Sequence, residues 1–132
     1  MVGERRYISS MPAAVRALRG ATTVEADTEA AITKAVQTLI GEMLARNDIA
    51  NDDLISILFT ATDDLTATFP ATPARLMGLG DVPLLSAREI SVAHGTARCV
   101  RVLMHLSTER TRSELRHVYL EGATGLNDDL PV

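Results

Sequence analysis

Tryptophan is absent from this chain of 132 residues, and the aromatic side chains amount to two phenylalanines and two tyrosines. The core must therefore be built from aliphatic side chains, which fits an apolar content of 46%. Cysteine occurs once, as Cys99, so an intramolecular disulfide framework and a thiolate zinc cluster are both excluded. A single unpaired cysteine agrees with a reducing cytosol.

Long apolar runs are also missing. No stretch approaches the roughly 18 residues needed to cross a bilayer, and residues 1–12 lack the apolar centre of a signal peptide. We therefore expect a soluble, cytoplasmic protein without a membrane partner. The formal net charge is −4 and the pI about 5.3, so no polycationic surface is available for nucleic acid. A bound anion must be held by a few local cations.

The length predicts a single domain over residues 1–132. A chain of this size buries roughly two thirds of the surface that its unfolded form exposes, so it can fold without disulfides. Residues 1–12 show neither helical nor strand periodicity, and we expect them to form a flexible N-terminal arm.

The first half of the chain predicts a strand and a long helix. Val15 to Val24 shows strand alternation with a break near Gly20. Asp27-Thr28-Glu29 then supplies an N-cap and an acidic first turn. Three further features of the helix are readable: the apolar face Ile32, Val36, Leu39, Ile40 and Met43, the ion pair Glu42 and Arg46, and the terminal Asn47.

The second half predicts further strands and a short helix. Leu54 to Thr62 is apolar without strict alternation, which is typical of a central strand buried on both faces. The short helix should be capped by Thr72, begin at Pro73 and stop at Gly78. The other predicted strands are Val82 to Ile90, Cys99 to Thr108 and His117 to Glu121. In the second of these, the apolar face is Val100, Val102, Met104 and Leu106, and the opposite face is Arg101, Leu103 and His105.

These elements predict an α+β fold, with a five-stranded mixed sheet, one long helix and one short helix. Two helices are too few to cover both faces of such a sheet. An uncovered apolar face needs a partner, and the simplest partner is another copy of the chain. We therefore expect a closed homo-oligomer.

Motifs for covalent or metal chemistry are missing. His94, His105 and His117 are widely spaced and form no metal-ligand pattern, so no metal site is expected. The chain has no nucleophile elbow, phosphate-binding loop or dinucleotide fingerprint. Cys99 opens an apolar strand, where we expect an inert core thiol.

Arginine stands at two positions where it is costly. Arg19 lies in the first strand and Arg101 in the middle of an apolar strand, and a buried guanidinium needs an anionic partner. Each could pair with a carboxylate of the chain, such as Glu89 or Glu121, or reach solvent at a sheet edge. Alternatively, both converge on an anionic ligand, with Glu89 and Tyr119 as polar neighbours. The residues alone leave both interpretations open.

Six short sequence motifs follow one another along the chain between residues 15 and 126. They are Arg19-Gly20-Ala21-Thr22-Thr23-Val24-Glu25, Ala61-Thr62-x-Asp64-Leu65, Phe69-Pro70-Ala71 with Arg75, Val82-Pro83 with Glu89, Cys99-Val100-Arg101-Val102, and Arg116-His117-Val118-Tyr119-Leu120-Glu121. This ordered set resembles the monofunctional bacterial chorismate mutases, which assemble as trimeric pseudo-α/β barrels. The resemblance implies a homotrimer with active sites between subunits. It also implies the Claisen rearrangement of chorismate to prephenate in aromatic amino acid biosynthesis, without an enzyme nucleophile, metal or cofactor.

The same resemblance implies a role for each site residue. Arg101 is aimed at the ether oxygen of chorismate, and Arg19 holds a substrate carboxylate. Glu89 accepts a hydrogen bond from the ring hydroxyl, and Tyr119 donates one to the substrate. The implied substrate-binding residues, with Arg75 near the mouth of the pocket, are Arg75, Phe69, Ala71, Leu85, Ser86 and Leu126.

Three positions depart from the commonest pattern of that family. Ser86 stands where many relatives have a cysteine, and a hydroxyl can make the same contacts. Thr72 and Asn127 replace basic residues at the rim, which lowers the positive charge available for substrate capture. The alternative is a trimeric small-molecule binder or an imine deaminase-like enzyme on a similar barrel. Glu89 favours the mutase, because a plain carboxylate binder has less use for it, and a purely structural oligomer would leave Arg101 unexplained.

Overall fold

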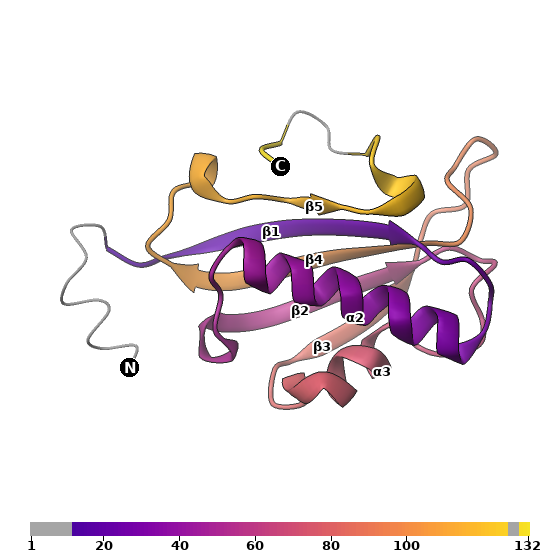
Figure 1. The fold of residues 1–132 in the computed structure, drawn as a ribbon, viewed down its shortest axis with the longest axis horizontal. Coiled ribbons are helices and arrows are strands. Elements are labelled where there is room, and N and C mark those ends of the chain that lie inside the picture. Colours follow the sequence, from indigo (N-terminus) through magenta and orange to yellow (C-terminus); the bar gives the residue numbers. More distant parts are fainter. Residues whose placement is uncertain (1–11, 127–129) are drawn as a thin grey trace.

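The computed structural model describes residues 12–126 and 130–132, and it places two helices on one face of a five-stranded sheet (Figure 1). The strands are β1 (Ala14–Thr23), β2 (Leu54–Ala61), β3 (Leu84–Arg88), β4 (Cys99–Thr108) and β5 (Val118–Tyr119). The helices are α2 (Glu29–Arg46) and α3 (Ala71–Ala74), and α3 continues into a further turn, Arg75–Leu79. The predicted α+β class and the predicted numbers of strands and helices are confirmed.

Strand β4 is the centre of the sheet, whose order is β3-β2-β4-β1-β5. It runs antiparallel to β1 along its whole length, from Thr108 opposite Ala14 to Cys99 opposite Thr23. It is also antiparallel to β2, whereas the outer strands β3 and β5 are parallel to β2 and β1. The sheet is therefore mixed, and its register fixes which side chains share a face.

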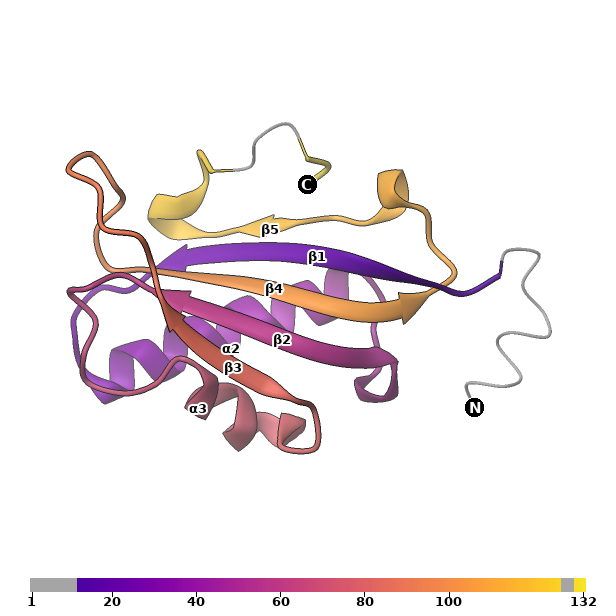
Figure 2. The same cartoon turned by 180° about the vertical axis from the view of Figure 1, so that it is seen from behind.

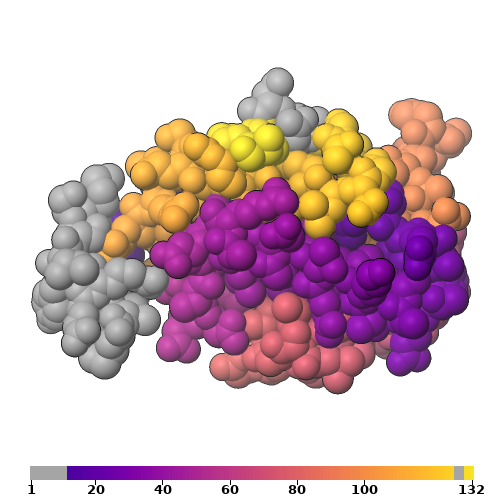
Figure 3. Space-filling model, viewed as in Figure 1, coloured from indigo at the N-terminus to yellow at the C-terminus, as the bar shows by residue number. Residues whose placement is uncertain are grey.

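Helix α2 packs along one face of the sheet, and its side chains form the middle of the surface seen in Figure 3. Thr28 Oγ1 accepts a hydrogen bond from the Ala31 N–H at 3.1 Å, and Asn47 is the residue after the helix, so both predicted ends are confirmed. The predicted Glu42–Arg46 ion pair is present at 3.3 Å. The predicted apolar face is buried throughout: Ile32, Val36, Leu39, Ile40 and Met43. No described helix has the length and hydrophobicity needed to span a membrane.

The side-chain amide of Asn47 joins the end of α2 to the segment before β5. Its Nδ2 donates to the carbonyl oxygens of Met43 (2.9 Å) and Arg116 (2.8 Å), and its Oδ1 accepts from the Arg116 N–H at 2.7 Å. Asn47 is buried, and these bonds use both ends of the amide. They hold the two-residue strand β5 beside β1.

The opposite face of the sheet carries no helix among the described residues, as Figure 2 shows. Strand β2 was predicted to be buried on both faces, and this prediction is wrong. Ile57 and Phe59 point toward α2 and are fully buried, whereas Leu58 between them is 38% exposed. The strand does lie inside the sheet, between β3 and β4, but only one of its faces is covered.

The predicted break near Gly20 is also wrong, because β1 is continuous from Ala14 to Thr23. Gly20 instead allows α2 to pack closely against β1. A Cβ at position 20 would overlap Met43 Sδ and would lie 3.2 Å from Leu39 Cδ1, so the absence of a side chain lets α2 approach the strand.

The short helix begins earlier than predicted. Pro70 already has helical dihedral angles, and the Thr72 N–H bonds to the Phe69 carbonyl, so Thr72 lies inside α3 and does not cap it. The predicted stop at Gly78 is confirmed, since its φ of 99° is a left-handed conformation that favours glycine.

Two predicted strands are shorter than expected. The predicted strand Val82 to Ile90 is reduced to β3, Leu84–Arg88. The predicted strand His117 to Glu121 is reduced to β5, because only Val118 and Tyr119 pair with β1. The predicted N-terminal arm falls almost wholly on residues 1–11, which lie outside the described residues.

Two glycine substitutions test this packing. Gly20→Ala should lower the free energy of unfolding by about 1–3 kcal/mol, because the new methyl group overlaps buried side chains of α2. Gly41→Ala is the matched control inside α2, where nothing lies within 4 Å of a new Cβ, and it should raise stability by about 0.5–1 kcal/mol. Urea denaturation measures both changes. Effects of equal sign would contradict the packing role of Gly20.

Candidate active site

Three of the predicted catalytic residues share the sheet face that no helix covers. Ala21 of β1 lies opposite Arg101 of β4 on one side and opposite Tyr119 of β5 on the other. Residues paired across strands project to the same face, and Arg19, two residues before Ala21, projects there as well. The strand register therefore makes Arg19, Arg101 and Tyr119 neighbours.

Glu89, the fourth predicted catalytic residue, pairs with Arg101. Its N–H donates to the Ala61 carbonyl at 2.9 Å, which extends the β2–β3 pairing one residue beyond β3. Glu89 Oε1 lies 3.3 Å from Arg101 Nε and accepts a hydrogen bond from Thr60 Oγ1 at 2.6 Å. The Arg101 contact is an ion pair without hydrogen-bond alignment, and the arginine side chain remains 35% exposed. Arg101 is thus paired within the chain and still open to a ligand.

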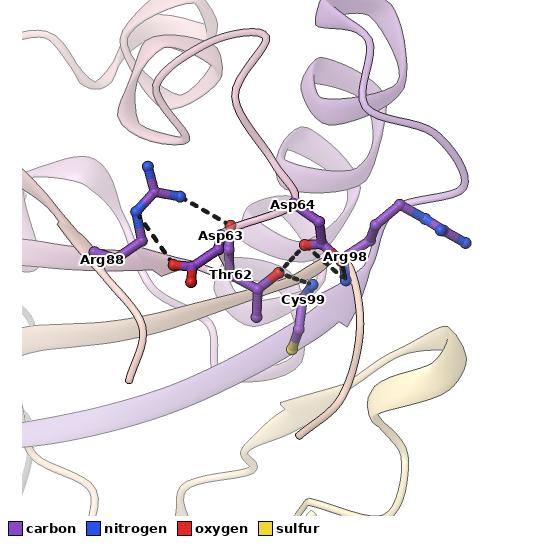
Figure 4. A network of polar contacts seen from close by, with 6 residues as sticks. All are labelled: Thr62, Asp63, Asp64, Arg88, Arg98 and Cys99. Carbon is purple, nitrogen blue, oxygen red and sulfur yellow. Dashed lines mark hydrogen bonds and ion pairs between the residues drawn. The ribbon is translucent and has the colours of Figure 1, made fainter. Parts of the chain in front are cut away.

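A polar network fixes the end of β2 to the start of β4 (Figure 4). Thr62 Oγ1 accepts from the Cys99 N–H at 3.0 Å and donates to Asp64. The Asp64 carboxylate in turn accepts from the Arg98 N–H at 2.9 Å. The hydrogen bond from Thr62 is the main reason that the pKa of Asp64 lies below its usual value. These bonds hold the strand end two residues before Arg101.

Cys99 lies in this network through its backbone, and its side chain is 1% exposed. Burial raises the pKa of the thiol, which keeps it protonated and unreactive at neutral pH. The predicted core position of Cys99 is confirmed. Among the described residues, no group of three or more His, Cys, Asp or Glu side chains is arranged to hold a metal ion.

His117 supports the backbone of Arg19. The Arg19 N–H donates to His117 Nδ1 at 2.9 Å, and the His117 N–H donates to the Pro131 carbonyl at 2.8 Å. His117 is buried, and burial together with the positive charge of Arg19 lowers the pKa of the imidazole. An accepting Nδ1 carries no proton, so the neutral ring is the form that holds Arg19 in place.

Tyr119 and Leu126 lie in a small cluster with Ala21 and Ala123. Tyr119 is only 8% exposed, and Leu126 is partly buried against the cluster. The turn between them is held to β1, because the Gly122 N–H donates to Thr23 Oγ1 at 3.0 Å. Leu126 is therefore placed beside the strand that carries Arg19.

The remaining predicted residues lie at the other edge of the sheet, around β3 and α3. Phe69 is 74% exposed and lines a hollow with Ser86, whose buried Oγ has no hydrogen-bond partner among the described residues. Ala71 is buried at the start of α3, and Arg75 is exposed in the turn that follows. Leu85 of β3 is 61% exposed and projects from the open face.

One chain does not gather the predicted site residues into one cavity. Glu89 and Arg101 line one hollow, Arg19 lines a second, and Phe69 with Ser86 lines a third. The charged residues and the wall residues are thus both present, but on separate parts of the surface.

Thr60 and His117 contact site residues directly, although neither is among the predicted site residues. Thr60 was read only as part of an apolar strand, since the pairing that sets it opposite Arg101 is not visible in the sequence. In the predicted strand His117 to Glu121, alternation places His117 on the face of Tyr119, and this is a usable signal. Its bond to Arg19 depends on the parallel pairing of β5 with β1.

Known proteins similar to this chain decide its family. A family model described as chorismate mutase type I matches residues 15–130. This chain belongs to that family. The chorismate mutase AroH of Thermus thermophilus is 46% identical over 117 residues, which cover 88% of this chain and 96% of the relative. The chorismate mutase AroH of Bacillus subtilis strain 168 is 39% identical over 117 residues, which cover 88% and 92%.

The solved structures agree with the family. A chorismate mutase from Clostridium thermocellum matches with a TM-score of 0.82 and 44% identity, over 83% of this chain and 98% of that chain. The predicted family is confirmed, and with it the predicted activity, that of a chorismate mutase, which is an isomerase. These relatives favour the mutase over the alternatives, which were a trimeric small-molecule binder, an imine deaminase-like enzyme and a purely structural oligomer.

The contact between His117 and Arg19 predicts a pH dependence of stability. Because the native pKa of His117 lies below its ordinary value near 6.5, the unfolded chain binds more protons in the interval between the two values. The stability that the buried, neutral imidazole contributes is complete above pH 6.5 and is lost as the pH falls through the lowered native pKa. The measurement is the denaturation midpoint at pH 7.5 and 5.5.

In His117→Asn, the amide oxygen replaces Nδ1 as the acceptor and does not titrate. The variant should therefore lose less stability than the parent protein between those two pH values. His94→Asn, at an exposed histidine, is the control and should keep the parent slope. Equal slopes in His117→Asn and the parent would contradict the assignment.

Proposed function

We propose that this enzyme rearranges chorismate to prephenate for aromatic amino acid biosynthesis in the cytoplasm, at sites shared between subunits of a homotrimer. The observation that carries the proposal is that Arg101, Glu89, Arg19 and Tyr119 all project from the open sheet face. Chorismate is a dianion, and this face offers two guanidinium groups beside one carboxylate. The direct test follows the loss of chorismate absorbance with purified protein, and no loss above the uncatalysed rate would refute the proposal.

Arg101 is proposed as the main electrostatic catalyst. In the rearrangement the C–O bond lengthens before the new C–C bond forms, so partial negative charge develops on the ether oxygen. The central strand β4 and the ion pair with Glu89 hold the guanidinium in place before the substrate binds. A charge that is already oriented stabilises the transition state without the reorganisation that water would need.

The other polar residues hold the substrate in a compact, reactive conformation. Arg19 binds a carboxylate, and Tyr119 donates a hydrogen bond. Glu89 accepts from the ring hydroxyl and balances the partial positive charge that develops on the ring. Holding a flexible dianion in this geometry lowers the entropic part of the barrier, and it requires no covalent intermediate.

A neighbouring subunit is proposed to complete each site. Val15, Leu58 and Leu85 are exposed on the sheet face that α2 leaves open, and an apolar face of this kind needs a cover. The family resemblance gives that cover as two further copies, arranged as a trimeric pseudo-α/β barrel. Each pocket would then combine the charged residues and Leu126 of one subunit with wall residues of the next, among them Phe69, Ala71, Leu85, Ser86 and Arg75.

Two departures from the commoner family pattern lower the positive charge available for substrate capture. Thr72, in α3 beside this wall, replaces a basic residue of the commoner pattern, and Asn127 does so outside the described residues. Arg75 is exposed near the same wall and remains available to attract the dianion.

The first prediction from this proposal concerns assembly. The protein should sediment as a trimer at micromolar concentration. Leu58→Glu, on the open face, should shift it toward monomer and abolish activity, because a charge there cannot be buried against another subunit. Thr38→Glu on the exposed side of α2 is the control and should remain trimeric and active. A parent protein that is fully active as a monomer would refute shared sites.

The second prediction separates charge from position at Arg101. Arg101→Ala should lower kcat by about 10²–10³, as expected for the loss of one oxyanion donor. Citrulline at position 101 keeps the shape and hydrogen-bond donors but removes the charge, and it should keep KM within about tenfold while most of the rate is lost. Arg19→Ala should mainly raise KM, because a carboxylate is present in ground state and transition state alike. A near-normal kcat with citrulline would exclude electrostatic catalysis by Arg101.

A further inference from the structure

Thr60 makes the shortest contact to the proposed catalytic carboxylate. Its Oγ1 donates to Glu89 Oε1 at 2.6 Å, a length typical of a hydrogen bond to a charged acceptor. Arg101 Nε lies 3.3 Å from the same oxygen. Both contacts meet the same oxygen, and among residues 12–126 and 130–132 Oε2 of Glu89 accepts no hydrogen bond. The two carboxylate oxygens of Glu89 therefore differ, because Thr60 and Arg101 contact Oε1 while Oε2 accepts no hydrogen bond within these residues.

The sheet fixes Thr60 at this point. Thr60 lies opposite Arg101 of β4 and opposite Ala87 of β3, two residues before Glu89. All these positions project from the open face, so the hydroxyl stands between the arginine and the glutamate. A threonine side chain is restricted at χ1, which makes it a more rigid support than serine.

Glu89 needs such a support. It follows the last residue of β3 and its side chain is 24% exposed. The terminal torsion of a glutamate is broad, so the carboxylate of an unsupported Glu89 would rotate between many orientations. The contact with Arg101 lacks hydrogen-bond alignment, which leaves the Thr60 hydroxyl as the directional restraint.

We propose that Thr60 is a positioning residue, which holds Oε1 of Glu89 so that Oε2 faces the ring hydroxyl of the substrate. This inference rests on the proposed function, because it takes the role of Glu89 from there. Thr60 itself does not touch the substrate. It acts through Glu89, because it holds Oε1 and thereby leaves Oε2 oriented toward the ligand.

The test compares three variants on β2. Thr60→Val keeps the shape of the side chain but removes the hydroxyl, and it should lower kcat/KM for chorismate about ten- to hundredfold. Thr60→Ser keeps the hydroxyl and should restore the parent value to within about fivefold. Ser56→Ala removes a hydroxyl that contacts His105 on the same face, and it should change little. Denaturation midpoints and sedimentation check that each variant is folded and assembled.

A pair of inhibitors gives a readout that a general structural role would not move. The probes are two bicyclic dicarboxylates shaped like the transition state, one with the ring hydroxyl and one without it. The parent enzyme should prefer the hydroxylated compound, and Thr60→Val should lose most of that preference while binding the other compound normally.

Two results would overturn the inference. One is an unchanged preference in Thr60→Val, and the other is equal weakening of both inhibitors. A parent enzyme without activity on chorismate would instead overturn the proposed function, so the two failures are distinguishable.

Discussion

The main constraint on this structure is that one long helix can cover only one face of a five-stranded sheet. The face against α2 becomes a dry aliphatic core, where an arginine could not be placed without a large desolvation cost. The open face therefore holds the guanidinium groups of Arg19 and Arg101, beside exposed side chains such as Leu58. The shortage of helix leaves one sheet face of the single chain uncovered, and this is the face from which the charged residues project.

The charged and apolar parts of the proposed site differ in how they are held. Arg101 lies in the central strand, paired with β1 on one side and β2 on the other, and the register of β2 with β4 and β3 places Thr60 and Glu89 beside it. The apolar residues Phe69 and Ala71 lie outside the strands, before and at the start of the four-residue helix α3. Electrostatic catalysis needs fixed charges, whereas a wall that admits and releases a ligand must adjust. In this fold the sheet, which is its most restricted part, holds the charges of the proposed site.

The sequence could predict the elements that local physics decides. The residues of α2 follow from Thr28, the helical spacing and Asn47, and β4 was predicted to its exact limits because its alternation is uninterrupted. Gly20 was misread as a break because only the packing of Met43 explains it. Thr60 could not be assigned, since its role depends on three strands meeting in one register. The roles of the arginines came from the family resemblance, whereas their shared face follows from the sheet.

The single cysteine of the chain offers one site for selective chemical modification. Cys99 is buried at the beginning of β4, two residues from Arg101, and no other thiol competes with it. A thiol reagent can reach it only when the strand end held by Thr62 opens. The rate of modification under native conditions therefore measures how often the start of β4 opens, as hydrogen exchange does for a backbone amide. The modification rate of Cys99 therefore reports how rigidly the strand beside Arg101 is held, and no cysteine has to be introduced for the measurement.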